Sequence, residues 1–375
     1  MITFNKPFLT GKEAHYMYET VFNGHTSGNG IFTKKCQHYF EERWNMKKCL
    51  MTTSCTDALE MAAILCNVMP GDEVIVPSYT FVSSALAFVR QGAKIVFADS
   101  MENNPNIDVP KLESLITSRT KVIVPVHYAG AACDMDLIMS LADKYNLFVV
   151  EDAAQAIDSL YKGKPLGTIG HLAAFSFHET KNIQCGEGGM LVINDERFIR
   201  RAEIIWEKGT NRAEFFRGEV NKYGWVDTGS SFLPADYVAG FLYAQLEELD
   251  KIQERRKYIW DKYYKGLKDI SQIVLPHIPW YATNNAHMFY MLCSNLAERT
   301  ALITFLKEQG VHAVFHYICL HTSPFYSEHY NGEGLPNAMK YDETLVRLPM
   351  FYELTDDEVD HIVNSIKLFY SKNSF

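Results

Sequence analysis

The sequence predicts an α/β protein with two parts, a large domain built on a mostly parallel β-sheet and a small α+β domain at the carboxyl end. In the middle of the chain, short apolar runs rich in Val, Ile and Phe alternate with helical patterns, as in a buried parallel sheet. After this region a long charged helical pattern, Glu248–Leu267, leads into mixed elements. We therefore expect a large domain at residues 1–250 and a small domain at residues 251–375.

The predicted elements alternate between strand and helix. Runs of about five residues have the length and composition of buried strands; they are Glu73–Pro77, Lys94–Asp99, Lys121–Val126, Leu147–Asp152, Leu172–Phe177 and Met190–Asn194. The helical patterns of the same region are Ala58–Cys66, Ser83–Gln91 and Asp136–Tyr145. The small domain is predicted to contain apolar runs at Ala286–Leu292 and His312–His316, and helices at Ala301–Gln309 and Asp356–Tyr370.

The 375 residues carry a net charge of −9, with 47% hydrophobic and 22% charged residues. This is the composition of an ordinary globular protein, and the acidic balance argues against binding to nucleic acid. The first residues show no signal-peptide pattern, and no run of about 18 apolar residues indicates a membrane span. We therefore expect a soluble cytoplasmic protein.

Cysteine and histidine spacing gives no sign of a metal site. The eight cysteines form no C-x-x-C pair, and the 13 histidines form no H-E-x-x-H motif. We therefore expect no bound metal. The cysteines are predicted to be small buried residues in a reducing compartment.

Two residues near strand ends are candidates for chemistry. Asp152 closes the run Leu147–Asp152, and ligands of open α/β sheets bind where strands end. Taken alone, this aspartate is better explained as a cap on a helix that starts in the next residues. Lys181 lies in a loop between two apolar runs, beside the glycines of GEGG at 186–189. A lysine in a loop is ordinarily solvated. A lysine that is buried, or that is flanked by apolar strands, can instead have a lowered pKa and form a Schiff base.

A third candidate is the segment 52–58, TTSCTDA, which leads into an apolar helical pattern. Its N–H groups and hydroxyls stand at a helix start, which favours an anion, and they belong to Ser54, Cys55 and Thr56. The alternative is ordinary helix capping by Thr56 or Asp57. Ser176, near the end of another apolar run, adds a further donor.

Together these features match the needs of pyridoxal 5′-phosphate. The lysine holds the aldehyde, and the acid keeps the pyridine nitrogen protonated, so that the ring accepts electrons. The helix start takes the phosphate, and Phe81, which follows the run Glu73–Pro77, is placed to stack on the ring. Each feature is weak alone, but jointly they predict a pyridoxal-phosphate enzyme with Lys181 as its catalytic residue.

Longer motifs carry a resemblance to a known family. They include F-S-F-H-x-x-K at 175–181, followed by GEGG; the further matching segments are 54–62, 71–85, 92–99, 124–130, 149–156, 167–182 and 347–351. On these motifs the sequence resembles the DegT/DnrJ/EryC1/StrS family of sugar aminotransferases along nearly the whole chain. The resemblance implies the aspartate-aminotransferase fold, called fold type I, and a homodimer whose active sites lie at the interface.

The same resemblance implies roles for single residues. Lys181 binds the cofactor covalently, Asp152 pairs with the pyridine nitrogen, and Gln155 lies near the ring hydroxyl. The residues that meet the phosphate are Cys55, Thr56 and Ser176, and the residue that stacks on the ring is Phe81. Ser231 stands where the family has an asparagine that reaches the phosphate of a neighbouring subunit.

Four positions depart from the family pattern. Cys55 replaces a usual glycine or alanine, but its backbone N–H is still present. In GSSFLPAD, at 229–236, Ser231 and Leu233 replace asparagine and arginine. The serine keeps one hydrogen-bonding group, whereas the leucine cannot replace a guanidinium. Cys319 replaces a usual proline.

Within the family, segments 207–236 and 315–321 most resemble the transaminases that make dTDP-4-amino-4,6-dideoxygalactose (TDP-fucosamine). The resemblance implies amino transfer from L-glutamate to a dTDP-4-keto-6-deoxyhexose, for a surface glycan such as the O-antigen of lipopolysaccharide. Amination at C3 and a gluco product remain alternatives. A sugar dehydratase of the same fold is disfavoured, because such enzymes carry histidine at the lysine position. A non-catalytic binding protein is disfavoured by the intact set Lys181, Asp152 and Gln155.

Contacts with the sugar nucleotide are open to two interpretations each. Residues of the small domain either approach the substrate or form a structural hydrogen-bonded cluster; they are His316, Tyr317 and His321. Lys208 and Arg212 either meet a diphosphate or are solvated surface charges.

Overall fold

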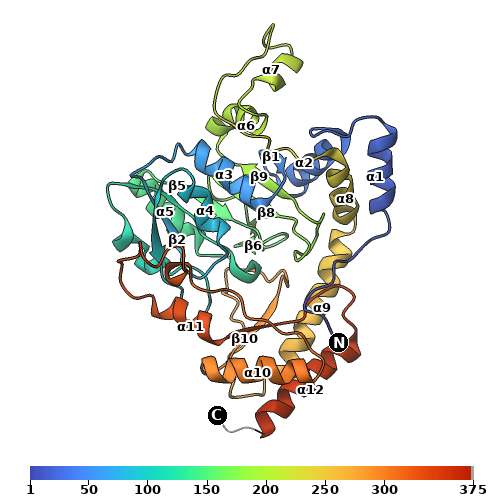
Figure 1. The fold of residues 1–375 in the computed structure, drawn as a ribbon, viewed down its shortest axis with the longest axis vertical. Helices are drawn as coiled ribbons and strands as arrows, with labels where there is room; N and C mark the ends of the chain where they lie inside the picture. Colours follow the sequence, from blue (N-terminus) through green and yellow to red (C-terminus); the bar gives the residue numbers. More distant parts are fainter. Residues whose placement is uncertain (373–375) are drawn as a thin grey trace.

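The computed structural model describes residues 1–372, and a seven-stranded β-sheet forms its larger part (Figure 1). The strands lie in the order β1 (Lys48–Thr52), β9 (Gly189–Ile193), β8 (Leu172–Ser176), β5 (Phe148–Asp152), β4 (Thr120–Ile123), β2 (Glu73–Pro77) and β3 (Lys94–Ala98). All run in the same direction except β9, which is antiparallel to both of its neighbours. The predicted α/β class with a mostly parallel sheet is therefore confirmed.

Helices cover both faces of this sheet, because successive strand residues point to opposite sides. One face packs against α3 (Cys55–Leu65), α4 (Ser83–Val89) and α6 (Ile199–Trp206). The other packs against α2 (Ile31–Trp44), α5 (Met135–Tyr145) and α8 (Asp236–Glu247), and α1 (Glu13–Phe22) lies on α8. In β2, for example, Val74 and Val76 face the first group of helices, whereas Ile75 faces the second.

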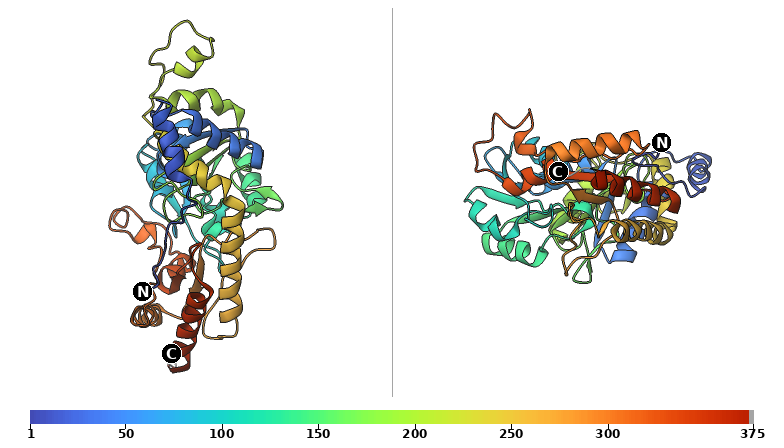
Figure 2. Two further views of the ribbon diagram at one scale, coloured as in Figure 1. Left: turned by 90° about the vertical axis from the view of Figure 1, so that its right-hand side faces the viewer. Right: turned by 90° about the horizontal axis from the view of Figure 1, so that it is seen from below.

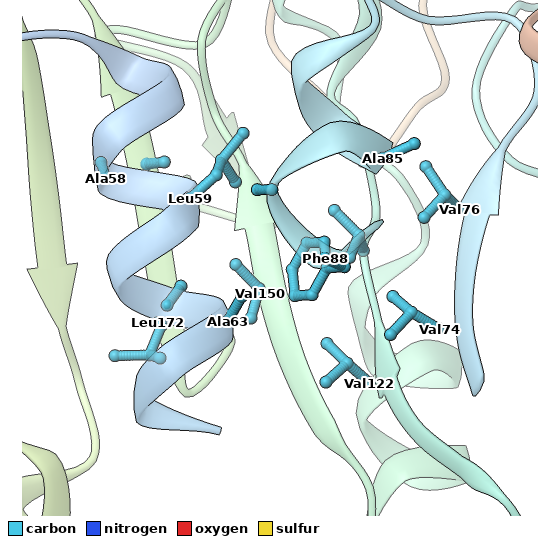
Figure 3. Close-up of a cluster of buried hydrophobic side chains, with 14 of the residues drawn as sticks. Ala58, Leu59, Ala63, Val74, Val76, Ala85, Phe88, Val122, Val150 and Leu172 are labelled. Atoms are coloured by element: carbon cyan, nitrogen blue, oxygen red, sulfur yellow. The ribbon is translucent and has the colours of Figure 1, made fainter. Parts of the chain in front are cut away.

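Figure 3 shows the first of these two cores. Its labelled side chains come from α3 (Ala58, Leu59, Ala63), α4 (Ala85, Phe88) and the strands (Val74, Val76, Val122, Val150, Leu172). Each fully buried Val, Leu or Phe side chain contributes roughly 1.5–3 kcal/mol to folding by leaving water. The two cores therefore hold the sheet rigidly and fix the positions at which its strands end.

The predicted strands agree with the observed ones to within a few residues, and the differences have local causes. The run Lys121–Val126 ends as a strand at Ile123, and Val126 retains only an isolated bridge to Asp152. The helix predicted at Ala301–Gln309 begins earlier, because the Asn295 side chain caps α10 (Leu296–Glu308). The predictions did not include β1, α1 or α2.

A smaller lobe lies below the sheet in Figure 1, and α9 (Leu249–Leu267) runs down into it from the large sheet. Its own core joins α9 and α10 with α12 (Asp356–Lys372) and an antiparallel pair, β10 (Phe289–Leu292) and β11 (Leu345–Leu348). Only the second half of the run Ala286–Leu292 is strand, and Val314 of the run His312–His316 forms a single bridge to Arg347. The boundary at residue 250 stays a prediction, and positions 373–375 lie outside the described residues.

The two faces of strand β11 pack against different parts of the molecule. Val346 and Leu348 belong to the core of the smaller lobe. Leu345 points the opposite way and packs with residues of the large sheet. Arg347 alternates with Val346 and Leu348, so it lies on the side of β11 that faces the large lobe.

One segment leaves the body of the molecule. Helix α7 (Arg212–Phe216) projects from the end opposite the smaller lobe, as Figure 1 and Figure 2 show. The remaining short elements are β6 (Leu160–Tyr161), β7 (Lys164–Pro165) and α11 (Pro336–Thr344). Within residues 1–372 no helix is both long and apolar enough to cross a membrane.

Candidate active site

The candidate residues meet at the edge where the parallel strands end. Asp152 is the last residue of β5, and Ser176 is the last residue of β8. Helix α3 begins three residues after the end of β1, and Lys181 lies in the loop between β8 and β9. The sheet order β1-β9-β8-β5 brings these points into one region, although they lie far apart in the sequence.

Asp152 is buried and held by two neutral donors. Its Oδ2 accepts a hydrogen bond of 2.6 Å from the Ser84 hydroxyl, and its Oδ1 accepts one of 3.1 Å from the Ala154 N–H. No helix follows it, because residues 153–159 form turns, so the interpretation as a helix cap is wrong. The carboxylate has no ion-pair partner within residues 1–372 and keeps the capacity to pair with a cation.

The loop that carries Lys181 is fixed at its base and at its tip. At the base, Phe177 N–H donates to Gly188 O at 2.8 Å and Glu179 N–H donates to Gly186 O at 3.0 Å. At the tip, the Asn182 amide donates to Gln253 and to Asn285 O, and its oxygen is 2.9 Å from His287 Nδ1. These bonds tie the residue after Lys181 to α9 and to the smaller lobe.

The Lys181 amine is half-buried and forms neither a hydrogen bond nor an ion pair within the described part of the chain. Burial lowers its pKa to about 8; the nearby Cys55 and Asp152 oppose this effect, and the Arg347 charge adds to it. At neutral pH a useful fraction of this amine is therefore unprotonated, which is what a nucleophile or a general base requires.

The start of α3 agrees with the predicted anion site but has a different cap. The cap is Ser54, whose hydroxyl accepts from Asp57 N–H at 3.1 Å, so capping by Thr56 or Asp57 is wrong. Two further N–H groups of the first turn, those of Cys55 and Thr56, have no acceptor inside the helix. Gly189 makes this arrangement possible, since a Cβ there would lie 2.4 Å from the carbonyl of Ser54.

The neighbouring hydroxyl and aromatic groups lie as follows. Thr56 Oγ1 is 2.8 Å from Ser83 Oγ at the start of α4. Ser176 is half-buried, and its Oγ accepts from His178 N–H at 3.4 Å. Phe81 is 56% exposed, and its ring centroid lies 5.9 Å from that of Tyr317. Phe81 and Tyr317 line a cavity of about 660 Å³.

Gln155 and Tyr317 form one hydrogen-bonded pair between the two lobes. The Gln155 amide donates to the Tyr317 hydroxyl at 3.2 Å, and its oxygen accepts from Ala129 N–H at 2.6 Å. Burial raises the pKa of Tyr317, so its hydroxyl keeps its proton. Tyr317 thus lies close to the buried strand ends.

The two predicted histidines lie in different surroundings. His316 Nδ1 is 3.0 Å from Arg347 Nη1. Burial and the Arg347 charge lower the pKa of His316 to about 4, so the neutral ring accepts this bond. His321 is buried, and its Nδ1 is 2.6 Å from the Ser78 hydroxyl, as in the structural alternative.

Three predicted residues line a separate cavity of about 600 Å³ on the same chain. They are Ser231, Lys208 and Arg212, all exposed, and Leu233 is in the same wall. Arg212 forms an ion pair of 3.8 Å with Glu207. The structure therefore does not bring these residues to Lys181 of their own chain.

Sequence reasoning missed several residues of this region. Ser84 bonds the buried carboxylate, and Asn182 and His287 anchor the lysine loop. Ser84 carried a weak signal, because it follows a strand in the matching segment 71–85. Arg347 also stood in a matching segment, RLPMF, but only the pairing of β10 with β11 reveals that it faces the large lobe.

The arrangement suits a phosphorylated aldehyde cofactor. Among residues 1–372, the amine of lowered pKa has no partner and is available for the aldehyde, and the buried carboxylate has no ion-pair partner and is available for a protonated ring nitrogen. The first turn of α3 offers N–H groups for a phosphate, and an exposed phenyl ring flanks the region. Fold and site together define a pyridoxal-phosphate enzyme of fold type I.

Comparison with known proteins gives the family. The profile of the DegT/DnrJ/EryC1/StrS aminotransferase family matches residues 9–367. The chain is 33% identical over 375 residues to the spore coat polysaccharide biosynthesis protein SpsC of Bacillus subtilis, covering 98% of this chain and 96% of that one. It is 33% identical over 372 residues to the GDP-perosamine synthase of Escherichia coli O157:H7, covering 98% of both.

A solved structure of a sugar aminotransferase agrees with this family assignment. The PLP-form of Spr1654 from Streptococcus pneumoniae superposes with a TM-score of 0.91 at 28% identity, covering 99% of each chain. The chain belongs to the DegT/DnrJ/EryC1/StrS aminotransferase family. It is a sugar-nucleotide aminotransferase, and its cofactor is pyridoxal 5′-phosphate.

Proposed function

We propose that the enzyme transfers the amino group of L-glutamate to C4 of a dTDP-4-keto-6-deoxyhexose. The product is a dTDP-4-amino-4,6-dideoxyhexose of galacto configuration, for a surface glycan such as the O-antigen of lipopolysaccharide. The observation that carries the reaction type is the unpaired Lys181 amine, with a pKa of about 8, beside the charge of Asp152. The choice of sugar is supported by the resemblance of segments 207–236 and 315–321.

In this proposal Lys181 is the proton carrier. When bound, pyridoxal phosphate accepts the electrons left behind as the donor α-carbon loses its proton. Lys181 Nζ would take that proton and deliver it to C4′ of the cofactor, on the other side of the amino nitrogen, and with the keto sugar it would move a proton in the opposite direction. An amine of ordinary pKa is almost wholly protonated at neutral pH and would perform this step poorly.

Asp152 and Gln155 hold the ring in this proposal. The Asp152 carboxylate would accept a hydrogen bond from the protonated pyridine nitrogen, and Ser84 and the Ala154 N–H keep its two oxygens in place. Gln155, which bonds Tyr317, is assigned to the ring hydroxyl. The ring is stacked by Phe81, whose side chain is free to move because it is 56% exposed.

The phosphate is assigned to the first turn of α3 and to Ser176. Ser54 serves as the cap, so its hydroxyl is occupied and its contribution is to orient the turn. The N–H groups of Cys55 and Thr56 then bind phosphate oxygens. Because Cys55 contributes its backbone, a thiol in place of a hydrogen or methyl group leaves this contact intact.

The sugar nucleotide is assigned to the cleft side of the smaller lobe and to a second subunit. Tyr317, which bonds Gln155, and His316 are assigned to contacts with the sugar, and His321, which bonds Ser78, is assigned to the same region. Lys208 and Arg212 are assigned to the diphosphate, and Ser231 to the phosphate of the cofactor in the partner subunit. These three residues line a cavity apart from the Lys181 of their own chain, and this position supports a homodimer in which each subunit contributes to the site of the other.

We also propose that the enzyme acts in the cytoplasm. All eight cysteines are free thiols, and seven of them are buried. Free thiols are typical of a reducing compartment.

The test is product analysis with defined substrates. Purified enzyme with L-glutamate and dTDP-4-keto-6-deoxyglucose should give a single amino sugar, which mass spectrometry and NMR identify as the 4-amino galacto isomer. The GDP-linked 4-keto-6-deoxy sugar is the control, because one relative is a GDP-perosamine synthase. Faster turnover of the GDP sugar would overturn the dTDP assignment, and an amine at C3 would overturn the C4 assignment.

A further inference from the structure

Asn182, the residue that follows Lys181, has its whole amide group engaged inside the protein. Its side chain is buried, and its Nδ2 donates to Gln253 Oε1 at 2.7 Å and to the Asn285 carbonyl at 2.9 Å. Its Oδ1 lies 2.9 Å from His287 Nδ1. A residue held in this way cannot turn without leaving buried polar groups unpaired, which is costly. The backbone at Lys181 is therefore fixed from its carboxyl side.

The chemistry of these groups decides which atom donates. A carbonyl oxygen only accepts, so the Asn182 amide nitrogen faces Asn285 and its oxygen faces His287. His287 therefore carries a hydrogen on Nδ1 and donates it to Asn182. Burial lowers the pKa of His287 well below its usual value, and the charge of Lys181 adds to this effect, so the ring is neutral. The influence of Lys181 also indicates that the ring lies near the amine.

The same short segment, residues 285–287, holds the turn that carries Gln155. The side chain of Asn285 is fully buried, and its Nδ2 donates to the carbonyls of Gln155 and Ile157 at 2.7 and 2.9 Å. Its Oδ1 accepts from the His287 N–H at 3.0 Å. The Asn285 side chain thus bonds the turn after β5, while its backbone carbonyl bonds the lysine loop after β8.

Segment 285–287 is itself anchored and strained. Arg256 of α9 donates to the carbonyls of Ala286 and His287 at 3.1 and 2.7 Å. Ala286 has a φ of 52°, in the left-handed region that a residue with a Cβ rarely adopts. Such strain persists only where the surroundings hold it, and it is concentrated in segments that position functional groups.

Both half-reactions need Lys181 and the cofactor ring in a fixed relation. Lys181 is assigned to the proton transfer, and Gln155 is assigned to the ring hydroxyl. The two residues lie in different loops, so the sheet alone does not set the distance between them. A displacement of about 1 Å in such an arrangement can lower a rate about 100-fold. Segment 285–287 bonds both loops at once.

We propose that segment 285–287 is a positioning element that sets the Lys181 amine against the cofactor ring, with His287 acting through its hydrogen bond to Asn182. This inference rests on the proposed function, because it takes Lys181 as the proton carrier and Gln155 as a contact of the ring. His287 is a positioning residue. Because its ring is neutral, it fixes the loop without adding a charge beside the amine.

The test compares two substitutions by amides that differ in reach. The amide nitrogen of asparagine stands at the place of the histidine Nδ1, and that of glutamine at the place of Nε2. His287→Asn therefore keeps a donor for Asn182, whereas His287→Gln removes it and keeps a polar side chain. Stopped-flow absorbance of the cofactor-loaded enzyme follows each half-reaction in a single turnover, first with L-glutamate and then with the keto sugar.

For His287→Gln we expect the rate constants of both half-reactions to fall about 10- to 100-fold, because the same amine moves the proton in each. The Kd values of L-glutamate and of pyridoxal phosphate should stay at their wild-type values. His287→Asn should keep both rate constants within about 3-fold of the wild type. L-Glutamate deuterated at Cα identifies the affected step. The isotope effect on the first half-reaction of His287→Gln should equal or exceed that of the wild type.

A second readout uses the cofactor-free enzyme and needs no turnover. An amine-reactive reagent should label Lys181 of the wild type with a midpoint near pH 8, because burial lowers the pKa of this amine to about 8. In His287→Gln the loosened loop exposes the amine to water, so the midpoint should move toward the usual pKa of 10.5. His287→Asn should keep the wild-type midpoint.

Asn182→Ala removes the same hydrogen bond from its other end. Its rate constants and its labelling midpoint should change at least as much as those of His287→Gln. Adding His287→Gln to Asn182→Ala should change neither any further, because the two residues act as one unit. Additive losses would show that His287 does not act through Asn182.

His171→Gln is the control for the loss of a ring hydrogen bond elsewhere. His171 Nδ1 accepts from the Val149 N–H at 3.0 Å near the start of β8, at the end of the strand opposite Ser176. Its rate constants, isotope effect and labelling midpoint should match the wild type, even where its unfolding temperature falls. Wild-type rates in His287→Gln, equal losses in His287→Asn, or a smaller isotope effect would overturn the proposal. If the wild type itself fails to react with L-glutamate, it is the proposed function that fails.

Discussion

Lys181 and Asp152 lie at the same edge of the sheet, and the Asp152 charge raises the pKa of Lys181, yet the two residues form no ion pair. A salt bridge would stabilise both charges and leave neither group free to act. Instead the carboxylate is held by a hydroxyl and an N–H group, and the amine has no partner among residues 1–372. Both groups are therefore available to a ligand placed between them, which is the arrangement an electron-accepting ring requires.

The first prediction concerns Lys181 itself. Lys181→Ala should lower the rate of amino transfer by about 10²- to 10⁴-fold or more, because it removes the group that moves the proton. Turnover is measured by formation of 2-oxoglutarate. Lys164→Ala is the control, since Lys164 is exposed and lies in β7, away from the strand ends. Wild-type turnover in Lys181→Ala would remove this residue from the mechanism.

The second prediction concerns the pH dependence of the same amine. In the cofactor-free enzyme the pKa of Lys181 lies at about 8, below its usual value of 10.5, because burial disfavours the charged form. The unprotonated fraction therefore rises with pH and reaches one half near pH 8. The rate at which an amine-reactive reagent labels Lys181, followed by peptide mass spectrometry, should have its midpoint there. A midpoint near 10.5 would show that the amine is solvated.

At the scale of elements, the start of α3 depends on close contact with β9. A Cβ on Gly189 would lie 2.4 Å from the carbonyl carbon of Ser54 and 2.5 Å from Cys55 N, and both are backbone atoms that cannot move alone. The strand would have to shift, and with it the first turn of the helix. Gly189 is therefore needed for the close packing that positions the phosphate site, and not for a turn.

Gly189→Ala should therefore weaken both the fold and the binding of the cofactor. We expect a loss of roughly 1–3 kcal/mol in the free energy of unfolding, as for other overpacked sites, measured by urea denaturation. The Kd for pyridoxal phosphate should rise in parallel. Gly334→Ala is the control, because no atom lies within 4 Å of a Cβ at that position. Equal effects in both variants would contradict the role of this contact.

Periodic signals in the sequence predicted the elements that lie fully inside the large sheet. The strand Glu73–Pro77 was predicted with its observed bounds, because a buried parallel strand is apolar on both faces. The strand Lys48–Thr52 was not predicted. It pairs only with β9 at the edge of the sheet, and its sequence KCLMT contains no β-branched residue except the last. A short strand without Val or Ile carries little local signal.

The residues of the site also fall into those that the sequence predicted and those that it did not. Lys181, Asp152 and the turn at Ser54 were predictable, because each follows a strand or opens a helix within one unit of the sequence. Arg347 and His287 come from the smaller lobe, more than 100 residues away from Lys181. Their approach depends on how that lobe packs against the sheet, which no local pattern encodes. The prediction of a helix directly after Asp152 was wrong for a local reason. The aspartate accepts a hydrogen bond from the Ala154 N–H, and the chain forms a turn there.

At the scale of the whole molecule, the segment around α7 has aromatic side chains but no core of its own. Phe216 and Trp225 are 69% and 82% exposed. Helix α7 of this segment lies at the end of the molecule opposite the smaller lobe (Figure 1). Large exposed aromatic groups on a projecting segment are typical of an interface. The chain closes again at its base, where Asn211 N–H donates to Gly224 O at 3.3 Å. The segment between residues 211 and 224 can therefore be removed without separating the parts of the fold that it connects.

We predict that replacing residues 212–223 with a short Gly-Ser linker gives a folded protein that still dimerises but has little activity, because in the proposed homodimer the segment contributes to the site of a second subunit. Sedimentation velocity measures the mass, and thermal unfolding checks the fold. The decisive measurement mixes this variant with Lys181→Ala after partial dissociation. Random pairing makes about half of the dimers mixed, and each has one complete site, so about a quarter of wild-type activity should return. If the active site lay within one chain, mixing two inactive variants would restore nothing, and the segment would act on the site of its own chain. The size of the recovered activity thus measures directly whether the two subunits share their sites.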